Sequence, residues 1–386
     1  MNPNINPHVK EIQISGIRQF FNRVQEYPEA MQLTLGQPDF PTPKHIKTAA
    51  KTALDKDKTT YTANAGTIEL RKAASEWIQN KYELAYHPFS EIIVTAGASQ
   101  AIDVAMRTIL EPGDEVIVPA PVYPAYAPII KQCGGIIKYA DTRKSDFKLT
   151  PELIREHISP ATKAIMIPYP SNPTGVVLSA DEMQALYLEL REKNIFIVAD
   201  EIYSELCFDD AHRTIASYPG MKEKTILING LSKSHSMTGW RIGFLFADAS
   251  ITQHLLKVHQ YNISCASSIS QEGALAALVE GQNDPEEMRE TYQKRRNWML
   301  SKLQEINIPV VKPGGAFYLF PDIRASGLSS FDFALQLLET EKLAVVPGDA
   351  FSEYGEGYIR ISYAYSMEQL EESMERLERF WKRIIS

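Results

Sequence analysis

The sequence predicts an α/β fold with a mainly parallel sheet flanked by helices. From residue 91 onward, short apolar runs alternate with helical patterns, which is typical of a parallel sheet with helices on both faces. Residues 195–199 are apolar at every position, as expected of a strand buried on both faces. With 386 residues, the chain is too long for one small core and suits two domains that share a cleft.

The predicted elements follow one another in a regular order. After a polar N-terminal arm and a turn-rich segment at 33–43, helical periodicity covers residues 46–54 and 68–81. A helix is also predicted at 99–110, and Glu111-Pro-Gly-Asp114 separates it from the next strand. The apolar runs predict strands at 92–95, 115–119, 136–139, 164–168, 195–199 and 225–228.

The C-terminal third has a different pattern, which predicts a smaller α+β domain. A long amphipathic stretch at 284–304 leads out of the alternating region. Strands are predicted at 314–320 and 358–362, and a helix at 331–339. Residues 367–385 place their apolar side chains on one helical stripe, which we expect to face the core.

Composition excludes several classes of function. The net charge of −8 and the isoelectric point near 5.6 argue against nucleic acid or an anionic membrane as partner. No signal peptide or membrane-spanning run is recognisable. The single cysteines Cys133, Cys207 and Cys265 predict a reducing cytoplasm, and the eight histidines show no metal-ligand spacing, so no metal site is expected.

One lysine stands in an unusual setting. Lys233 lies among small residues, in a loop after the strand 225–228, and Arg241 follows eight positions later. Taken alone, a lysine that follows a serine in a loop is most simply explained as a solvent-exposed side chain. An enzyme that binds a carbonyl cofactor as a Schiff base, however, needs such an amine. Its ordinary pKa of ~10.4 must then be lowered by its surroundings.

A carboxylate and a rigid turn follow two other predicted strands. Asp200 directly follows the apolar run 195–199, and the carboxyl ends of strands are where open α/β sheets bind ligands. The alternative role for Asp200 is that of a helix N-cap. Ser171-Asn-Pro-Thr-Gly175 is a proline-containing turn that follows the strand 164–168.

In combination, these segments resemble the class I/II family of pyridoxal-phosphate-dependent aminotransferases, of fold-type I and Iγ-like. The resemblance extends from Leu35-Gly-Gln-Pro-Asp-Phe40 to Arg360-Ile-Ser-Tyr363 and includes Ala199-Asp-Glu-Ile-Tyr203. It implies a large cofactor-binding domain at 46–287 and a small domain that combines 1–45 with 288–386. It also implies pyridoxal 5′-phosphate as cofactor and a homodimer with shared active sites.

The resemblance assigns the central chemistry to four residues. Lys233 would bind the cofactor and carry the proton between the substrate and the cofactor. Asp200 would pair with the protonated pyridine nitrogen, which keeps the ring an electron sink. Tyr203 and Asn172 would donate hydrogen bonds to the ring oxygen O3′, although Tyr203 could also be a packed aromatic at the end of a strand.

The resemblance further implies a phosphate site. Ala98 and Ser99 begin a predicted helix, and their backbone amides can bind an anion at its N-terminus. Arg241 would add a positive charge beside the phosphate. Ser232 would add a hydroxyl, and Tyr61 would reach the phosphate of the neighbouring subunit. Family members often carry Ser or Thr three positions before the lysine; here that residue is Gly230, which puts one phosphate contact in doubt.

Three further residues match positions around the substrate. Tyr123, in Pro121-Val-Tyr-Pro-Ala-Tyr126, matches the aromatic residue that stacks on the cofactor ring, or it packs on the core as a loop aromatic. Arg360 matches the arginine that binds the substrate α-carboxylate through two parallel hydrogen bonds. Asn172 and the backbone of Gly36 would assist Arg360.

The expected activity is transfer of an amino group from an L-amino acid to a 2-oxo acid such as 2-oxoglutarate. The overall pattern resembles the bacterial aminotransferase A group, which is assigned to N-acetyl-LL-2,6-diaminopimelate in lysine biosynthesis. Aromatic or aspartate transamination and C–S lyase or γ-elimination chemistry remain open. Ser99 stands where some Iγ enzymes carry a lysine for a distal carboxylate, which disfavours a dedicated aspartate enzyme. An effector-sensing domain of a transcription regulator would need a preceding basic helix-turn-helix module.

Overall fold

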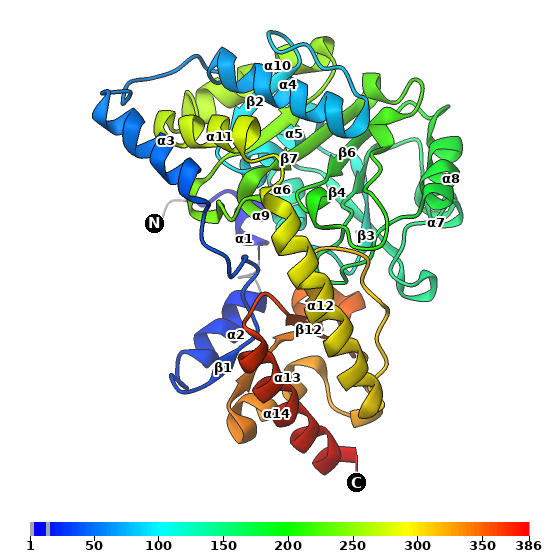
Figure 1. Cartoon of the computed structure of the whole chain (residues 1–386). Coiled ribbons are helices and arrows are strands. Elements are labelled where there is room, and N and C mark those ends of the chain that lie inside the picture. Colours follow the sequence, from blue (N-terminus) through cyan, green and yellow to red (C-terminus); the bar gives the residue numbers. More distant parts are fainter. Residues whose placement is uncertain (1–3, 13–15, 386) are drawn as a thin grey trace.

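The computed structural model describes residues 4–12 and 16–385. Figure 1 shows an upper part, which holds a large sheet with helices around it, and a lower part, which contains both early and late segments of the chain. Helix α12 (Asp284–Glu305) runs from the upper part into the lower one. None of the described helices is long and apolar enough to cross a membrane.

The upper part contains a seven-stranded sheet, and the predicted α/β class is confirmed. The strand order is β2-β8-β7-β6-β5-β3-β4, and only β8 runs antiparallel to its neighbours. The strands are β2 (Ile92–Thr95), β3 (Glu115–Ala120), β4 (Ile136–Asp141), β5 (Thr162–Ile167), β6 (Phe196–Asp200), β7 (Thr225–Gly230) and β8 (Gly243–Phe246). All six strands predicted in this region are therefore present, and β8 was not predicted.

Helices cover both faces of this sheet. Alternate residues of β6 enter different cores: Ile197 packs with one cluster and Val198 with the other. The Ile197 face is covered by α4 (Ile68–Tyr82) and α8 (Ala180–Leu190), with α7 (Pro151–His157) and α11 (Ser268–Glu280). The Val198 face is covered by α5 (Ala98–Ile109), α6 (Tyr126–Gln132) and α10 (Ala249–Ile263).

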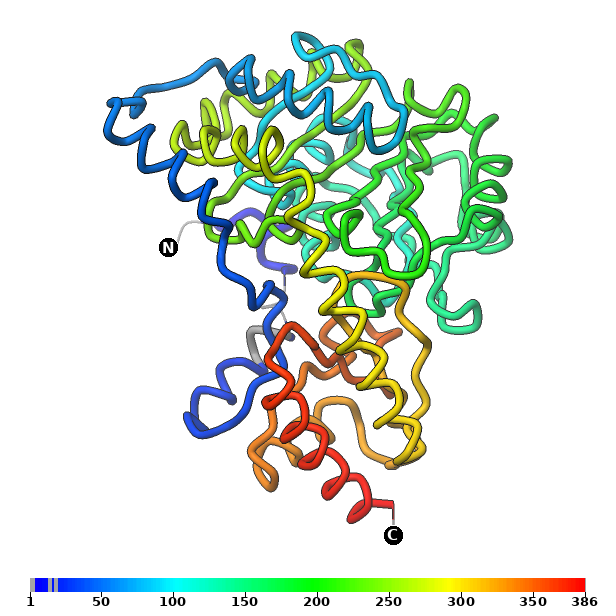
Figure 2. The backbone as a smooth tube through the Cα atoms, in the orientation of Figure 1, coloured from blue at the N-terminus to red at the C-terminus, as the bar shows by residue number. Residues whose placement is uncertain are grey.

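The lower part joins segments from both ends of the chain. Strand β1 (Met31–Gln32) pairs with β10 (Leu343–Ala344), and Figure 2 shows this early segment beside the late one. A second small sheet has the order β11-β12-β9, with β9 (Tyr318–Leu319), β11 (Val346–Pro347) and β12 (Ile359–Ser362). The helices of the lower part include α2 (Gly16–Val24), α13 (Ser330–Glu341) and α14 (Met367–Ile385). The predicted apolar stripe of α14 packs into the core of this part.

The structure differs from the predictions at three places. Of the strand predicted at 314–320, only β9 belongs to a sheet. Gly315 forms an isolated bridge with Cys207, and the amides of Gly314 and Gly315 donate to the carbonyl of Gly175. The lysine segment, expected as a loop, contains the one-turn helix α9 (Leu231–Ser234). The arm contains α1 (Pro7–Lys10) and α2, and α3 (Lys44–Asp55) follows it. The predicted domain boundary at 287/288, within helix α12, stays a prediction.

Candidate active site

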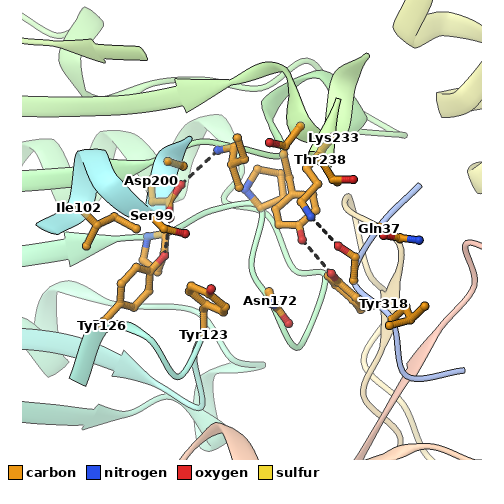
Figure 3. Close-up of a pocket in the computed structure, with 18 of the residues that line it drawn as sticks. Gln37, Ser99, Ile102, Tyr123, Tyr126, Asn172, Asp200, Lys233, Thr238 and Tyr318 are labelled. Atoms are coloured by element: carbon orange, nitrogen blue, oxygen red, sulfur yellow. Dashed lines mark hydrogen bonds between the residues drawn. The ribbon is translucent and has the colours of Figure 1, made fainter. Parts of the chain in front are cut away.

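A cavity of about 450 Å³ lies where the carboxyl ends of the large sheet meet the lower part of the molecule (Figure 3). One wall comes from residues at or after the carboxyl ends of β3, β5, β6 and β7, together with the start of α5. The other wall comes from residues 34–37, β9 and β12. Its lining is Thr34, Leu35, Gly36, Gln37, Ala98, Ser99, Ile102, Tyr123, Tyr126, Pro168, Pro170, Asn172, Asp200, Ile202, Tyr203, Ser232, Lys233, Thr238, Arg241, Tyr318 and Arg360.

The acid of the cavity is Asp200, the last residue of β6. Its side chain is buried, with 6% of the residue exposed. The hydroxyl of Tyr126 donates to Oδ2 at 2.7 Å, and the amide of Ile202 donates to Oδ1 at 3.3 Å. Burial raises the pKa of the Asp200 carboxyl to about 6, and these two hydrogen bonds oppose the rise. Near neutral pH, the side chain is therefore a buried carboxylate with neutral donors around it.

The amine of the cavity is Lys233, on the one-turn helix that follows β7. Its Nζ donates to the carbonyl of Gly36 at 2.5 Å. Burial, reinforced by the positive charges of Arg360 and Arg241, lowers the pKa of Lys233 to about 8, and Asp200 opposes this shift. A substantial fraction of the amine is then neutral at physiological pH, which is the nucleophilic form.

The beginning of α5 forms an anion-binding corner with Arg241. Gly97 precedes the helix with φ +83°, and a Cβ at this position would lie 2.4 Å from Nη2 of Arg241. Only glycine therefore lets the guanidinium come so close to the first amides of the helix, at Ala98 and Ser99. A guanidinium beside a helix N-terminus matches the requirements of a phosphate.

Arg360 occupies the opposite wall, on β12. The residue is 3% exposed, and no carboxylate in the described part of the chain forms an ion pair with it. Its two terminal nitrogens donate to Oδ1 of Asn172 at 3.0 Å and to the carbonyl of Thr34 at 2.5 Å. Its Nε has no hydrogen-bond partner although it is buried. Burial lowers the pKa of the guanidinium. Such a cation is well placed to receive an anionic ligand.

Two tyrosines connect the walls. The hydroxyls of Tyr203 and Tyr318 share a hydrogen bond of 2.8 Å, and both rings are buried. Oδ1 of Asn172 accepts from Arg360, and the amide nitrogen of Asn172 remains for the predicted donation to a cofactor oxygen.

The cavity contains nearly all the residues that the sequence singled out. They are Gly36, Ala98, Ser99, Tyr123, Asn172, Asp200, Tyr203, Ser232, Lys233, Arg241 and Arg360. Tyr61 lies outside the cavity and is 87% exposed in this single chain. At Gly230, a Cβ would lie 3.1 Å from the carbonyl oxygen of Ile242, so a larger residue has little room there.

Sequence reasoning missed both tyrosines that form side-chain hydrogen bonds with Asp200 and Tyr203. Tyr126 belongs to a motif that was noticed for Tyr123, but nothing in the motif pointed to the contact with Asp200. Tyr318 lies in an apolar segment in which a tyrosine is indistinguishable from a core residue. Thr34, Gln37 and Ile102 also line the cavity without having been predicted.

Known proteins resemble this chain over nearly its whole length. The sequence model of the family "Aminotransferase class I and II" matches residues 28–377. A Bacillus subtilis (strain 168) protein described as a probable N-acetyl-LL-diaminopimelate aminotransferase is 54% identical over 376 residues, which cover 97% of this chain and 95% of that protein. The chain belongs to this family. It is an aminotransferase, and the predicted family and reaction class are confirmed.

Solved aminotransferases share the whole fold. An aromatic aminotransferase from Pyrococcus horikoshii has a TM-score of 0.89 and 40% identity, with 94% of this chain and 99% of that chain covered. A mutant aspartate aminotransferase from Thermus thermophilus has a TM-score of 0.94 and 34% identity, with coverages of 98% and 100%. The chain is therefore a fold-type I aminotransferase, of a family that uses pyridoxal phosphate.

Proposed function

We propose that this aminotransferase binds pyridoxal 5′-phosphate in the cavity and uses 2-oxoglutarate as amino acceptor. The observation that carries the proposal is the arrangement of three groups around one cavity. Lys233 has an amine with a lowered pKa, Asp200 has a buried carboxylate, and Arg241 lies against the N-terminus of α5. The donor set fits the cofactor, which presents an aldehyde, a ring nitrogen and a phosphate.

The residues that would hold the cofactor are spread around the cavity. Asp200 would face the ring nitrogen, Tyr203 and Asn172 the ring oxygen, and Tyr123 the ring face. The phosphate would be bound by Ala98, Ser99, Ser232 and Arg241. Bound pyridoxal phosphate would supply an electron sink for the electron pair released at the substrate Cα.

The chain itself would contribute binding, orientation and proton transfer. Arg360 would bind the substrate α-carboxylate with two hydrogen bonds and so fix the direction of the Cα–H bond. The neutral amine of Lys233 would accept the proton from Cα and return a proton to complete the transfer. The negative charge of the Asp200 carboxylate would stabilise the protonated form of the ring nitrogen.

For the donor, we propose N-acetyl-LL-2,6-diaminopimelate, and hence a role in lysine biosynthesis. This choice is supported by the 54% identity to the Bacillus subtilis relative. The alternatives are an aromatic or aspartate donor, as in the names of other relatives, or C–S lyase chemistry on the same fold.

A donor screen tests these choices. Purified protein loaded with pyridoxal phosphate would be incubated with single amino donors and 2-oxoglutarate, and glutamate would be measured. We expect glutamate to form fastest with the N-acetylated diaminopimelate. Faster formation with an aromatic donor or aspartate would replace the proposed substrate. Release of ammonia, pyruvate and a thiol from S-substituted cysteines without glutamate would indicate a lyase instead.

We further propose a homodimer in which Tyr61 reaches the phosphate of the partner site. The support is the exposed ring of Tyr61, which lies outside the cavity of its own chain. Mixing inactive Lys233→Ala and Tyr61→Phe subunits would place both defects in one hybrid site and leave the other intact. Heterodimers should then have about half the activity of a wild-type dimer. No recovery despite demonstrated subunit exchange would contradict the shared site.

Two other expectations also stay predictions. The first is the division into a domain at 46–287 and a small domain at 1–45 and 288–386. The second is the cytoplasmic location, which was inferred from the cysteines.

A further inference from the structure

Tyr318 lies at the centre of the cavity, but the proposed reaction gives it no role. The residue is fully buried on β9 and pairs with Ser362 of β12, the strand that carries Arg360. Figure 3 shows its side chain at the cavity, with its hydroxyl in a hydrogen bond. Tyr318 therefore contacts the wall that carries Arg360 and the wall that carries Tyr203.

The ring of Tyr318 lies against the guanidinium of Arg360. The guanidinium carbon is 4.5 Å from the Tyr318 ring centroid and 4.9 Å from that of Phe351. Ring faces attract a cation. Unlike a carboxylate, they leave the N–H edges of the guanidinium available for a carboxylate that arrives with a ligand. The ring thus helps to hold an uncompensated buried cation in place.

The hydroxyl of Tyr318 bonds to a different partner. It shares a 2.8 Å hydrogen bond with the hydroxyl of Tyr203. A tyrosine hydroxyl has one proton, so if Tyr203 donates to a cofactor oxygen, Tyr318 must be the donor between the two tyrosines. Close packing fixes the position of the Tyr318 hydroxyl, since a Cβ at Gly36 would lie 2.6 Å from it.

We propose that Tyr318 is a positioning residue with two separable parts: its ring holds the Arg360 guanidinium, and its hydroxyl donates to Tyr203. The inference rests on the proposed function, because Tyr203 is taken to contact the cofactor oxygen. The hydroxyl of Tyr318 makes Tyr203 a stronger donor through a chain of two hydrogen bonds. The substrate clamp and the cofactor site then share one side chain.

The variant Tyr318→Phe removes only the hydroxyl. A weaker donation from Tyr203 leaves more negative charge on the cofactor oxygen, which holds the neighbouring proton more tightly. The pH at which the absorbance of the lysine-linked cofactor changes should therefore rise by about 0.5 pKa unit. Because the ring remains, the KM for amino acids should stay within about threefold of the wild-type value.

The variant Tyr318→Leu removes the ring as well. The KM for amino acids should then rise by about tenfold, in addition to the spectroscopic shift. Tyr363→Phe is the matched control: Tyr363 is also a buried tyrosine of this core, but it lies outside the cavity lining, and its hydroxyl donates to the carbonyl of Ala316. This control should leave both the absorbance titration and the KM unchanged.

The outcomes separate this inference from the proposed function. A wild-type protein without a titrating cofactor absorbance would overturn the proposed function, and the inference with it. A normal wild-type titration together with an unshifted Tyr318→Phe would overturn only the role of Tyr318. An equal shift in Tyr363→Phe would also overturn it, because any buried tyrosine would then have the same effect. An unchanged KM in Tyr318→Leu would overturn the role of the ring; if that variant does not fold, the Tyr318→Phe titration still decides the role of the hydroxyl.

Discussion

The two walls of the cavity carry buried charges of opposite sign, and the comparison between them explains what each wall selects. Asp200, at the end of β6, is an anion that accepts hydrogen bonds from a hydroxyl and an amide. Arg360, on β12, is a cation that donates to an amide oxygen and a carbonyl. Within the described residues, neither side chain forms an ion pair.

The difference teaches that each wall keeps its charge available for a ligand. A buried charge without a counter-ion costs free energy, and a ligand of opposite charge recovers part of that cost. The Asp200 wall is part of the seven-stranded sheet and fits a cationic ring nitrogen. The Arg360 wall is assembled from distant segments and fits a carboxylate. Lys233 connects the two walls through its hydrogen bond to Gly36.

The largest expected effect comes from removing the connecting amine. Lys233→Ala should lower transamination by at least about 10⁴-fold, because the amine is proposed to be both the attachment point of the cofactor and the proton carrier. The absorbance of the lysine-linked cofactor should disappear. Lys382→Ala, on the exposed face of α14, is the control and should behave as wild type. Normal turnover by Lys233→Ala would refute the proposed chemistry.

The second effect concerns the acidic wall. Asp200→Asn keeps an acceptor for Tyr126 but removes the charge, and turnover should fall by about 10²–10³-fold. The loss of cofactor affinity should be smaller than the loss of rate; the reverse order would make Asp200 structural.

The same variant has a stability consequence that depends on pH. The pKa of Asp200 is raised to about 6 by burial, above its unfolded value of ~3.9, so its ionisation costs stability above about pH 6 and not below about pH 4. Cofactor-free Asp200→Asn should therefore be more stable than wild type at pH 8, by roughly 1–3 kcal/mol. Thermal unfolding at pH 8 and pH 4 checks this, and a gain of equal size at both values would show a cause other than ionisation.

The third effect concerns the basic wall. Arg360→Lys should raise the KM for amino acids by about 10–100-fold and lower turnover as well, because a point charge cannot form two parallel hydrogen bonds to a carboxylate. Amines without a carboxylate should be hardly affected. Equal losses for amines and amino acids would mean that Arg360 supports the fold and does not recognise substrate.

The smallest effect measures how strongly the walls interact. The positive charge of Arg360 helps to lower the pKa of Lys233 to about 8. Arg360→Met should therefore raise the pKa of the amine, by less than about one unit because burial is the larger cause. The pH dependence of reductive methylation of Lys233 in cofactor-free protein, followed by mass spectrometry of the peptide, reports this value. An unchanged value would show that the two walls are electrostatically independent.

Sequence reasoning found the large sheet well because buried parallel strands are continuous apolar runs. It missed β8, which follows directly after the segment of Lys233 and Arg241, because an apolar run of four residues does not by itself identify a strand. It overextended the strand around Tyr318, because backbone hydrogen bonds to Gly175 cannot be read from an apolar pattern. Local patterns thus predict elements, whereas pairing between distant segments decides which of them become strands.

The candidate site shows the same limit. Lys233 and Asp200 stand out because a charge among small or apolar residues needs an explanation. Tyr126 and Tyr318 do not stand out, because tyrosine is common in cores and its hydroxyl partner is chosen by the fold. The contact between Arg360 and Thr34 joins residues 326 positions apart, and nothing in either segment alone indicates it.

That long separation also sets the order in which a new molecule acquires its parts. A ribosome releases the amino end first, at about 5–20 residues per second. All seven strands of the large sheet lie between residues 92 and 246, whereas β12 begins at Ile359. Asp200 and Lys233 therefore leave the ribosome on the order of ten seconds before Arg360. During synthesis, the nascent chain completes the wall proposed for the cofactor while it still lacks the arginine proposed to recognise the substrate.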